Sequence, residues 1–472
     1  MNNLINEIKS RVKFDYSFDN PKDITEYSHL TYEKEIEIKT PEGSKNVNAK
    51  IWTKAFEKAL SENDNLYVPD IGEVIYLDDS IVLSSNKKLK VEKTQRIAMI
   101  PHAAVTLVRN KNLISGVEKF LQLDNPDCGI VIDGGIWDSL EYTKEYTKAS
   151  QNGNFKLWSS KEDYIPGAWA IMIFSNVQDI IIKNATFENG QSYAIQISNC
   201  EGMDIQDLQF NNYHKDGVHI NGTVRYGYVG NLTGKDMGDD MVAMNAWDWN
   251  TSAMSFGSIE KLFVENVFSS HNEFRLLPGR KTYSDGTFAD CDIRDCVIKN
   301  VEGVYTFKLY GQPNCHNTAD CSETLGVINN VYFEDIKFPE ISPEGFGGLP
   351  VEGLFEVCAD VSDVWLNNIS IESPYADFEK YGVNVIKVGP LSATIKYNPD
   401  DISTWIEVFY PDNICTMKDT HIGKISFADC TVTKDDLDMV IKATRQTPNP
   451  DYPNTTPKGG TGYGIVENVI FE

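Results

Sequence analysis

The sequence predicts an all-β protein: a right-handed parallel β-helix (solenoid) with an N-terminal helical cap and long groove-side loops. Two observations lead to this prediction. Between residues 176 and 472 one phrase recurs, in which a few apolar or β-branched residues lead to an Asn or Asp and an alternating apolar strand follows. The shortest steps between copies are 23 and 24 residues, which suits a bare coil of strands stacked roughly 4.8 Å apart.

The polar residue keeps its place within the phrase, as in Ile182–Phe187 and Ile205–Phe210. Asn and Asp tolerate left-handed backbone geometry and hydrogen-bond their own turn. Stacked coils would also let each amide bond the next. A β-sandwich with regular turns is the alternative, but it does not explain the fixed polar position. The shared residues are Asn184, Asp207, Asn231, Asn266, Asp295, Asp335, Asn368, Asp429 and Asn468.

The N-terminal third has a different pattern. Residues 46–62 carry apolar side chains at helical spacing, among them Ile51, Phe56 and Leu60. We expect an amphipathic helix here to cover the open end of the solenoid. Short strands are expected at Asn65–Pro69, Val74–Leu77 and Ile81–Leu83, and a first coil at Gly129–Gly135.

Two segments lack the repeat and are rich in Lys, Ser, Asn, Pro and Gly, so we expect loops at 139–168 and 433–463. Loops at 139–168, 246–257 and 372–420 would wall off one end of the groove. The chain is interpreted as a single domain over residues 1–472, with a cap region at 1–100 and coils at 125–472.

Composition limits the function classes. The net charge of −26 argues against nucleic acid or an anionic membrane as the main partner. Hydrophobic residues at 41% and charged residues at 24% are typical of a soluble protein. The chain shows neither a signal-peptide pattern nor an apolar run that would span a bilayer. It is therefore expected to be cytoplasmic as given, or secreted if a leader has been removed.

The nine cysteines form no CxxC pair, and an odd, scattered set fits reduced thiols. Cys291 with Cys296, or Cys315 with Cys321, could pair in an oxidising compartment. We expect no cofactor and no metal, and the sequence leaves the oligomeric state open.

Two acidic motifs lie about one coil apart, because Asp239 and Asp240 follow Asp216 by 23 and 24 residues. Asp216, Asp240 and Arg275 each come nine residues after a shared turn residue, which predicts that they form a column. Adjacent strand residues point to opposite faces, so Asp239 and Asp240 can both reach the groove only at a bend or bulge. Such a cluster is costly to assemble and indicates acid–base chemistry.

The motifs His214–Gly217 and Gly238–Ala243 resemble those of the polygalacturonase family of pectin-degrading glycoside hydrolases (family 28 and close relatives). In that family an Asn-Thr-Asp motif precedes an Asp-Asp pair by about one coil, and Gly-His-Gly and Arg-Ile-Lys follow. The resemblance covers roughly residues 125–340. It implies an inverting hydrolase with Asp239 as general acid, and with Asp216 and Asp240 holding the attacking water. Inverting enzymes separate their two carboxyl groups by roughly 6.5–9.5 Å.

Two of the family's motifs are altered. Ser270–Glu273 stands where Gly-His-Gly would fall, so His271 aligns only with a shift of one residue. Thr306–Lys308 keeps the Lys of Arg-Ile-Lys and loses the Arg; the family uses these two cations to bind a uronate carboxylate. Arg275 or Arg280 is a candidate replacement, unless the substrate is not a galacturonate.

The candidate substrate-binding residues also include Lys308, His271, Trp247, Trp249 and Tyr310. Lys308 and His271 come from the altered motifs, and a surface lysine and a surface histidine are the alternatives. The two tryptophans are candidates for stacking on sugar rings, or else they pin their loop.

The sequence therefore predicts a glycoside hydrolase that cleaves O-glycosidic bonds of an oligosaccharide or polysaccharide. The substrate is expected to be pectin-related or another uronic-acid-containing glycan, with exo action on short chains and weak activity on polymeric pectin. One alternative is a Ca²⁺-dependent polysaccharide lyase, which makes an unsaturated product and is stopped by a chelator. Another is a non-catalytic, tailspike-like glycan-binding β-helix, whose binding survives loss of all three Asp residues.

Overall fold

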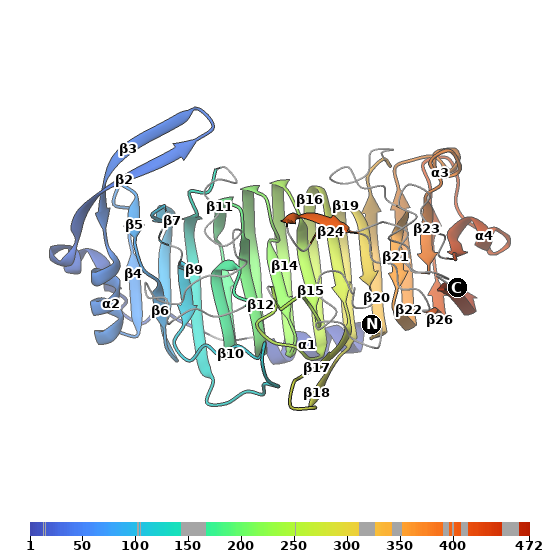
Figure 1. The fold of residues 1–472 in the computed structure, drawn as a ribbon, viewed down its shortest axis with the longest axis horizontal. Coiled ribbons are helices and arrows are strands. Elements are labelled where there is room, and N and C mark those ends of the chain that lie inside the picture. Colours follow the sequence, from blue (N-terminus) through green and yellow to red (C-terminus); the bar gives the residue numbers. More distant parts are fainter. Residues whose placement is uncertain are drawn as a thin grey trace.

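A computed structural model confirms the all-β architecture, with parallel strands wound into an elongated body (Figure 1). It describes residues 1–472 except 13, 15, 102, 104, 143–166, 251, 311–325, 342–351, 390–395, 399–400, 407–413 and 446–461. Within that part, 25 strands form one continuous sheet. Each long strand pairs in parallel with the strand one coil further on, so that Ile205 lies beside Val229. The right-handed winding and the domain boundaries stay predictions.

The central coils follow the predicted repeat. They comprise β9 (Asp127–Asp138), β10 (Ala170–Lys183), β11 (Thr186–Gly190), β12 (Tyr193–Tyr213), β13 (Val218–Asn221), β14 (Val224–Met237), β15 (Asp240–Asn245), β16 (Ile259–Leu277), β19 (Ile293–Tyr310), β20 (Val327–Phe338), β21 (Gly353–Cys358) and β22 (Asp360–Ile371). The C-terminal coils add β23 (Asn384–Val388), β26 (Ile414–Ile422), β27 (Ile425–Ser426), β28 (Ile441–Ala443) and β29 (Tyr463–Phe471). Two antiparallel pairs lie outside the main sheet: β17 (Gly279–Thr282) with β18 (Phe288–Cys291), and β24 (Lys396–Asn398) with β25 (Asp401–Ile406).

Inward-pointing apolar residues fill the solenoid coil by coil. Val242, Phe274, Phe307 and Phe355 are neighbours in register and all are buried. The rings of Phe274 and Phe307 lie 5.1 Å apart, and those of Phe307 and Phe355 lie 5.2 Å apart. Because side chains alternate along a strand, the residues next to this apolar column point outward, which positions the candidate site.

The polar turn residues do hold left-handed backbone, but at more than one bend per coil. The first bend contains Asn184, Asp207, Asn231, Asn266, Asn300, Asp335 and Asn368, with φ between 53° and 58°. Amide side chains bond along it, from Asn231 to Asp207 at 2.9 Å and from Asn266 to Asn231 at 2.8 Å. This confirms the amide ladder for six of the nine predicted residues.

The other three predicted residues were assigned wrongly. Asp295 and Asn468 belong to a second bend five residues earlier in the coil, with φ of 55° and 52°. Asp419 occupies that second bend near the C-terminus, and Asp429 is in neither ladder. Both bends favour Asn or Asp for the same reason, so spacing alone could not separate them.

The N-terminal third contains both the predicted helix and an unpredicted hairpin. Helix α2 begins at Thr53 and not at residue 46, because 43–51 is strand. The elements between residues 22 and 110 are β1 (Lys22–Asp23), the 3₁₀ helix η1 (Ile24–Leu30), β2 (Tyr32–Thr40), β3 (Gly43–Ile51), α2 (Thr53–Glu62), β4 (Asn65–Val68), β5 (Ile75–Leu77), β6 (Ile81–Leu83), β7 (Lys88–Met99) and β8 (Val108–Asn110). The antiparallel β2–β3 hairpin projects from the blue end, where α2 also lies (Figure 1).

The buried face of α2 includes Ala55, Phe56 and Leu60, which join the main core. The three short strands that follow α2 confirm the predicted segments. Parallel pairing already starts with β1 and β4, however, and continues from β4 to β7, so the coils begin well before the predicted first coil at residue 129. The prediction missed these coils because their strands lack the turn phrase.

Helix α1 (Asn2–Val12) lies against the outside of the central coils (Figure 1). Ile8 and Val12 bury themselves against Phe263 and Val297, two outward residues in register on successive coils. Arg11 reaches Asp179 at 2.8 Å, so polar contacts also hold the helix to the sheet.

The predicted loops are only partly loops. Residues 143–166 and 446–461 lie outside the described part of the chain, whereas Ala246–Gly257 contains no helix or strand among its described residues. The region 372–420 was wrongly interpreted as one loop. It contains α3 (Tyr375–Tyr381) and β23, which pairs in parallel with β21 and β28 as a further coil. The segment after 433 begins with η5 (Lys434–Asp436) and α4 (Leu437–Val440).

Cys291 and Cys296 are free thiols, as are the other cysteines that the structure describes. Cys315 and Cys321 lie outside the described residues. Among the described helices, none combines the length and the apolar character needed to cross a bilayer.

Candidate active site

Asp216, Asp239 and Asp240 form one acidic cluster on adjoining coils. Asp216 lies in the turn before β13, Asp239 directly precedes β15, and Asp240 is its first residue. One carboxylate oxygen from each lies within 4.8 Å of the others. The strand register shifts between Asp240 and Val242, which confirms that an irregularity lets both members of the pair approach Asp216.

The predicted column is wrong in one member. Arg275 is in register with Ala243 and, one coil earlier, with His219, whereas Glu273 lies opposite Asp240. Register shifts in β16 around Asn272 displace the strand relative to the counted turn residue. We call the outward, in-register residues His219, Arg275, Lys308, Glu356 and Lys387 the charged row.

A lysine and an arginine contact the acidic cluster directly. Lys215 places Nζ 3.1 Å from Asp239 Oδ2. An Arg275 guanidinium nitrogen lies 3.1 Å from Asp240 Oδ2 and 3.8 Å from Asp239 Oδ1. The same nitrogen is 3.6 Å from Glu273 Oε2, and Lys308 is ion-paired to that Glu273 oxygen. The cluster is therefore one end of a continuous network of charges.

A buried histidine supports the cluster from behind. His219 Nδ1 lies 2.6 Å from Asp216 Oδ2, and His219 Nε2 lies 3.1 Å from Asp248 Oδ2. Tyr193 stacks on the imidazole at a centroid distance of 3.9 Å. Asn245 donates a hydrogen bond of 2.9 Å to Asp248. Asp216 is thus held in one orientation by a residue that is itself fixed on both sides.

The three carboxyl groups differ in accessibility. The Asp239 side chain is 23% exposed, whereas those of Asp216 and Asp240 are 3% and 0% exposed. Asp239 is therefore the member of the cluster that a ligand can touch. The other two can act on a ligand only through an intervening group such as water.

The carboxyl groups also differ in proton affinity. Burial raises the pKa of Asp240 well above its ordinary value, and the charges of Asp216 and Asp239 add to the rise while Arg275 opposes it. Burial and the neighbouring Asp239 likewise raise the pKa of Asp216, although the hydrogen bond from His219 opposes them. Burial also raises the pKa of Asp239, but Lys215 and Arg275 outweigh it and the net pKa is lowered. The free protein therefore keeps its proton on Asp240 in preference to Asp239.

The imidazole of His219 is positively charged at neutral pH. Burial lowers its pKa, but hydrogen bonds to Asp216 and Asp248 outweigh burial and raise it to about 9. A cation between two carboxylates compensates part of the charge that the cluster concentrates in this buried place.

The predicted substrate-binding residues fall into separate groups. Lys308, with a side chain 15% exposed, and Tyr310 are on β19 close to Glu273 and Glu356 respectively. Arg280 lies on the β17–β18 hairpin, where it pairs with Asp290 at 2.7 Å. His271 is part of β16, but its side chain is outside the described set.

The tryptophan prediction does not hold for Trp247. Its side chain is buried in the core, with 1% exposed, so the ring cannot stack on a sugar in this structure. Trp249 is partly exposed and meets Trp247 edge-on at a centroid distance of 6.2 Å. The loop after β15 therefore anchors itself through Trp247, because a large apolar ring gains more from the core than from the surface.

Sequence analysis missed four residues of the site: Lys215, His219, Asp248 and Glu273. Lys215, His219 and Glu273 lie within three residues of a predicted acidic or basic site residue. His219 and Glu273 could have been found by listing the outward positions on neighbouring strands. Asp248 had no such signal, because its loop folds back onto His219 by tertiary contacts alone.

The donor set of the cluster also fits a cation. Three carboxylate oxygens within 4.8 Å of one another are the ligand type that Ca²⁺ and Mg²⁺ prefer. Lys215 and Arg275 already place positive charge against Asp239 and Asp240, however. A bound metal ion would compete with these two side chains.

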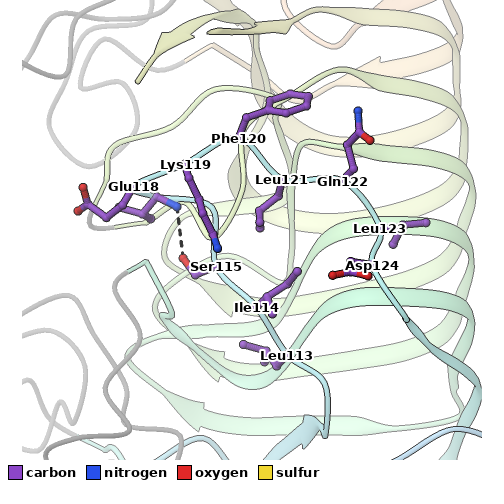
Figure 2. Close-up of a pocket in the computed structure, with 11 residues that line it drawn as sticks. Leu113, Ile114, Ser115, Glu118, Lys119, Phe120, Leu121, Gln122, Leu123 and Asp124 are labelled. Carbon is purple, nitrogen blue, oxygen red and sulfur yellow. Dashed lines mark hydrogen bonds between the residues drawn. The ribbon is translucent and has the colours of Figure 1, made fainter. Parts of the chain in front are cut away.

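A separate hollow lies away from the cluster. A pocket of about 900 Å³ is lined entirely by residues 113–124, a segment that crosses the coils (Figure 2). None of the three clustered aspartates lines it. Its walls come from one short stretch of chain, with an exposed Phe120, so it shows no convergence of chemistry-bearing groups from different coils.

The fold and the site define a parallel β-helix protein with a three-carboxylate cluster on adjoining coils. Among solved structures, an exopolygalacturonase from Thermotoga maritima is similar, with a TM-score of 0.50 and 12% identity over 100% of this chain and 96% of that chain. A tailspike protein of E. coli bacteriophage HK620, solved as a point mutant with a pentasaccharide, has a TM-score of 0.50 and 12% identity over 100% of this chain and 72% of that chain. No protein-family model and no curated protein sequence matches the chain. At such identities both likenesses concern the fold.

Proposed function

We propose that the protein is a glycoside hydrolase that acts on an oligosaccharide by acid–base catalysis. The observation that carries the proposal is that the carboxyl groups of the acidic cluster differ in exposure and in pKa. One carboxyl group is accessible, two are buried beside it, and burial raises the pKa of Asp240 well above its ordinary value. Glycoside hydrolysis needs one carboxyl group to protonate the leaving oxygen and a second to activate water.

In this proposal Asp239 is the general acid, because it is the cluster member within reach of a glycosidic oxygen. Asp216 and Asp240 orient the attacking water, and His219 positions Asp216. In this proposal Asp240, whose pKa is raised well above its ordinary value, supplies the proton that Asp239 gives. A sugar that covers Asp239 removes water from it and so raises its pKa toward that of its neighbour.

The separation of the carboxyl groups differs from the expectation for an inverting enzyme. Their nearest oxygens lie within 4.8 Å, against roughly 6.5–9.5 Å between carboxyl groups in typical inverting sites. Inversion is supported instead by burial. Neither Asp216 nor Asp240 is exposed enough to bond an anomeric carbon, so the attacking group is water.

The first test compares the wild type with Asp239→Asn on a panel of defined oligosaccharides, with reducing-end release as the measurement. The amide keeps the shape of the side chain and has no acidic proton, so we expect the rate to fall by roughly 10²–10⁴. The matched control is Asp207→Asn, a turn position that accepts a hydrogen bond from Asn231 and can do so as an amide. Normal turnover by Asp239→Asn would place the acid elsewhere.

The second test is the stereochemistry of the product. Proton NMR of the first-formed reducing end should show the anomer opposite to that of the substrate, because water attacks directly. A retained anomer, or a glycosyl group trapped on the protein, would contradict this assignment and make a carboxylate of the cluster the nucleophile.

The three clustered oxygens also favour a second candidate, a cation-dependent lyase. Such an enzyme would form a product that absorbs in the near ultraviolet, and a chelator would stop it. A non-catalytic glycan-binding protein would bind glycans without releasing reducing ends, and its binding would survive replacement of all three aspartates. The same oligosaccharide panel, read for absorbance and for binding, separates these candidates from hydrolysis.

A further inference from the structure

We infer that the glycan cleaved at this site carries no carboxylate on the sugars beside the scissile bond, and that Glu273 is the residue that excludes uronates. This inference rests on the proposed function and narrows its substrate class to neutral sugars. It departs from the expectation of a uronic-acid-containing substrate, which came from the resemblance to polygalacturonases.

Glu273 already pairs with Lys308, the cation that a uronate carboxylate would need. Its carboxylate pairs with Lys308 and lies 3.6 Å from the guanidinium of Arg275. The Glu273 side chain is 6% exposed, so it is fixed in place and does not sweep through solvent. Lys308 therefore faces the outer surface with its charge already balanced.

The other cations next to the cluster are balanced in the same way. Lys215 pairs with Asp239, and Arg275 pairs with Asp240 as well as with Glu273. His219 lies between the carboxylates of Asp216 and Asp248. Among the described residues in direct contact with the acidic cluster, each cation thus has a carboxylate partner within 3.1 Å. A ligand carboxylate could gain one of them only by displacing a protein carboxylate.

Further along the solenoid, the charged row again pairs a lysine with a glutamate. Lys387, two strands beyond Lys308, is ion-paired to Glu352. Between them Glu356 accepts a 2.7 Å hydrogen bond from the hydroxyl of Tyr310 and a 3.1 Å bond from the backbone N–H of Glu352. In this part of the described chain, the row presents carboxylates and paired lysines in alternation.

This arrangement suits hydroxyl groups and repels carboxylates. A carboxylate of the protein accepts hydrogen bonds and needs donors, which sugar hydroxyls provide. A uronate brings a further negative charge close to Asp239, Glu273 and Glu356, where the low local dielectric strengthens repulsion. The net charge of −26 adds a long-range field of the same sign.

The test uses matched pairs of oligosaccharides that share linkage and length, each pair containing a uronate and its carboxyl-reduced counterpart. We expect the wild type to hydrolyse the carboxyl-reduced member with a kcat/KM at least tenfold higher. Glu273→Gln frees Lys308 and should shift this ratio at least tenfold toward the uronate. Glu273→Asp keeps the charge and should retain the wild-type preference.

Faster hydrolysis of the uronate members by the wild type would overturn the inference. An unchanged ratio in a Glu273→Gln protein that unfolds at the wild-type temperature would do the same. Because Glu273 is buried, a binding measurement accompanies the kinetics. Asp239→Asn protein on an array of neutral and uronate glycans should bind neutral glycans, and binding confined to uronates contradicts the inference.

The kinetic comparison and the glycan array together also separate this inference from the proposed function. If no oligosaccharide of either class is hydrolysed, the proposed hydrolase activity fails, and the array alone decides between neutral and acidic ligands. If hydrolysis occurs and depends on Asp239 but favours uronates, the hydrolase stands and the role of Glu273 falls. An array on which no glycan binds overturns both.

Discussion

His219 connects the acidic cluster to a loop that the strands do not position. Its side chain is fully buried, with Asp216 on one ring nitrogen, Asp248 on the other, and Tyr193 stacked on the ring face. A charged imidazole in this position fixes two carboxylates at once, so one residue couples the geometry of the site to the fold of residues 246–257.

Replacing His219 with Gln should change how stability depends on pH. The pKa of His219 in the folded protein, about 9, lies above its ordinary value of 6.5. Its stabilisation is therefore fully present below pH 6.5 and is lost as pH rises through about 9. The upper limit of this contribution is on the order of 3 kcal/mol. We expect the free energy of unfolding of His219→Gln to vary less than that of the wild type across this window.

Urea unfolding at several pH values measures this difference. His421→Gln is the matched control, because His421 is partly exposed and pairs with Glu472 at 2.9 Å near the C-terminus. Because His219 also lowers the pKa of Asp216, the comparison measures the histidine together with its effect on that carboxyl group. Parallel curves for wild type and His219→Gln would show that the imidazole is neutral between its carboxylates.

At the scale of elements, the amide ladders hold the coils in register. The central coils contain two bends that lie five residues apart, as at Asp295 and Asn300, and both residues have positive φ. Asn266 illustrates the two roles of a ladder residue. Its φ is 58°, its amide donates to Asn231, and its carbonyl oxygen accepts from Asn300 at 2.6 Å.

Asn266→Ala should lower stability by roughly 1–2 kcal/mol through the left-handed backbone, plus about 1 kcal/mol for lost side-chain hydrogen bonds. Asn266→Gly removes the same amide but tolerates positive φ. Thermal or urea unfolding of the two variants therefore separates the contributions, and Gly should be the milder change. Equal losses in both variants would mean that the hydrogen bonds alone carry the effect.

The repeat was predictable because it depends on local chemistry, whereas the details of the site depend on irregularities. Asn or Asp at a bend and apolar residues inside a strand are visible in any single coil. The position of Arg275 was not, because register shifts around Asn272 move β16 by an amount that the sequence does not mark. Trp247 was misassigned for a related reason: a loop tryptophan can face a sugar or the core, and only packing decides.

The acidic cluster itself was predictable, since Asp216 and the Asp-Asp pair are one coil apart. Its proton distribution was not. Asp239 and Asp240 are adjacent in sequence, yet their pKa values shift in opposite directions. Burial raises the pKa of both, but at Asp239 the charges of Lys215 and Arg275 outweigh burial and lower it. That difference comes from side chains that arrive from the preceding and the following coils.

For the whole molecule, the solenoid presents the cluster near the middle of an elongated row and not at its end. β13 and β15 have described coils on both sides, and residues 246–257 pack back toward Gln196, which donates a 2.8 Å hydrogen bond to the carbonyl of Ser252. This loop therefore covers outward positions of the preceding coil, and we expect it to limit how far a glycan extends in that direction.

We accordingly expect exo action on short glycans and little activity on polymeric pectin. Chromatography of early products should show one constant small product. Viscometry should show a slow loss of viscosity for any polymer that is cleaved. Products of many lengths from the start, or rapid endo-cleavage of polygalacturonate, would contradict both the blocked direction and the exclusion of uronates.

Helix α1 sets an order of events during synthesis. It is the earliest described element, yet the residues that bury Ile8 and Val12, Phe263 and Val297, leave the ribosome about 250 residues later. At typical elongation rates of about 5–20 residues per second, the apolar face of α1 waits for tens of seconds without its partner. The coils must therefore be wound before their own first helix can dock, and an isolated N-terminal fragment would expose a face that invites chaperones or other nascent chains.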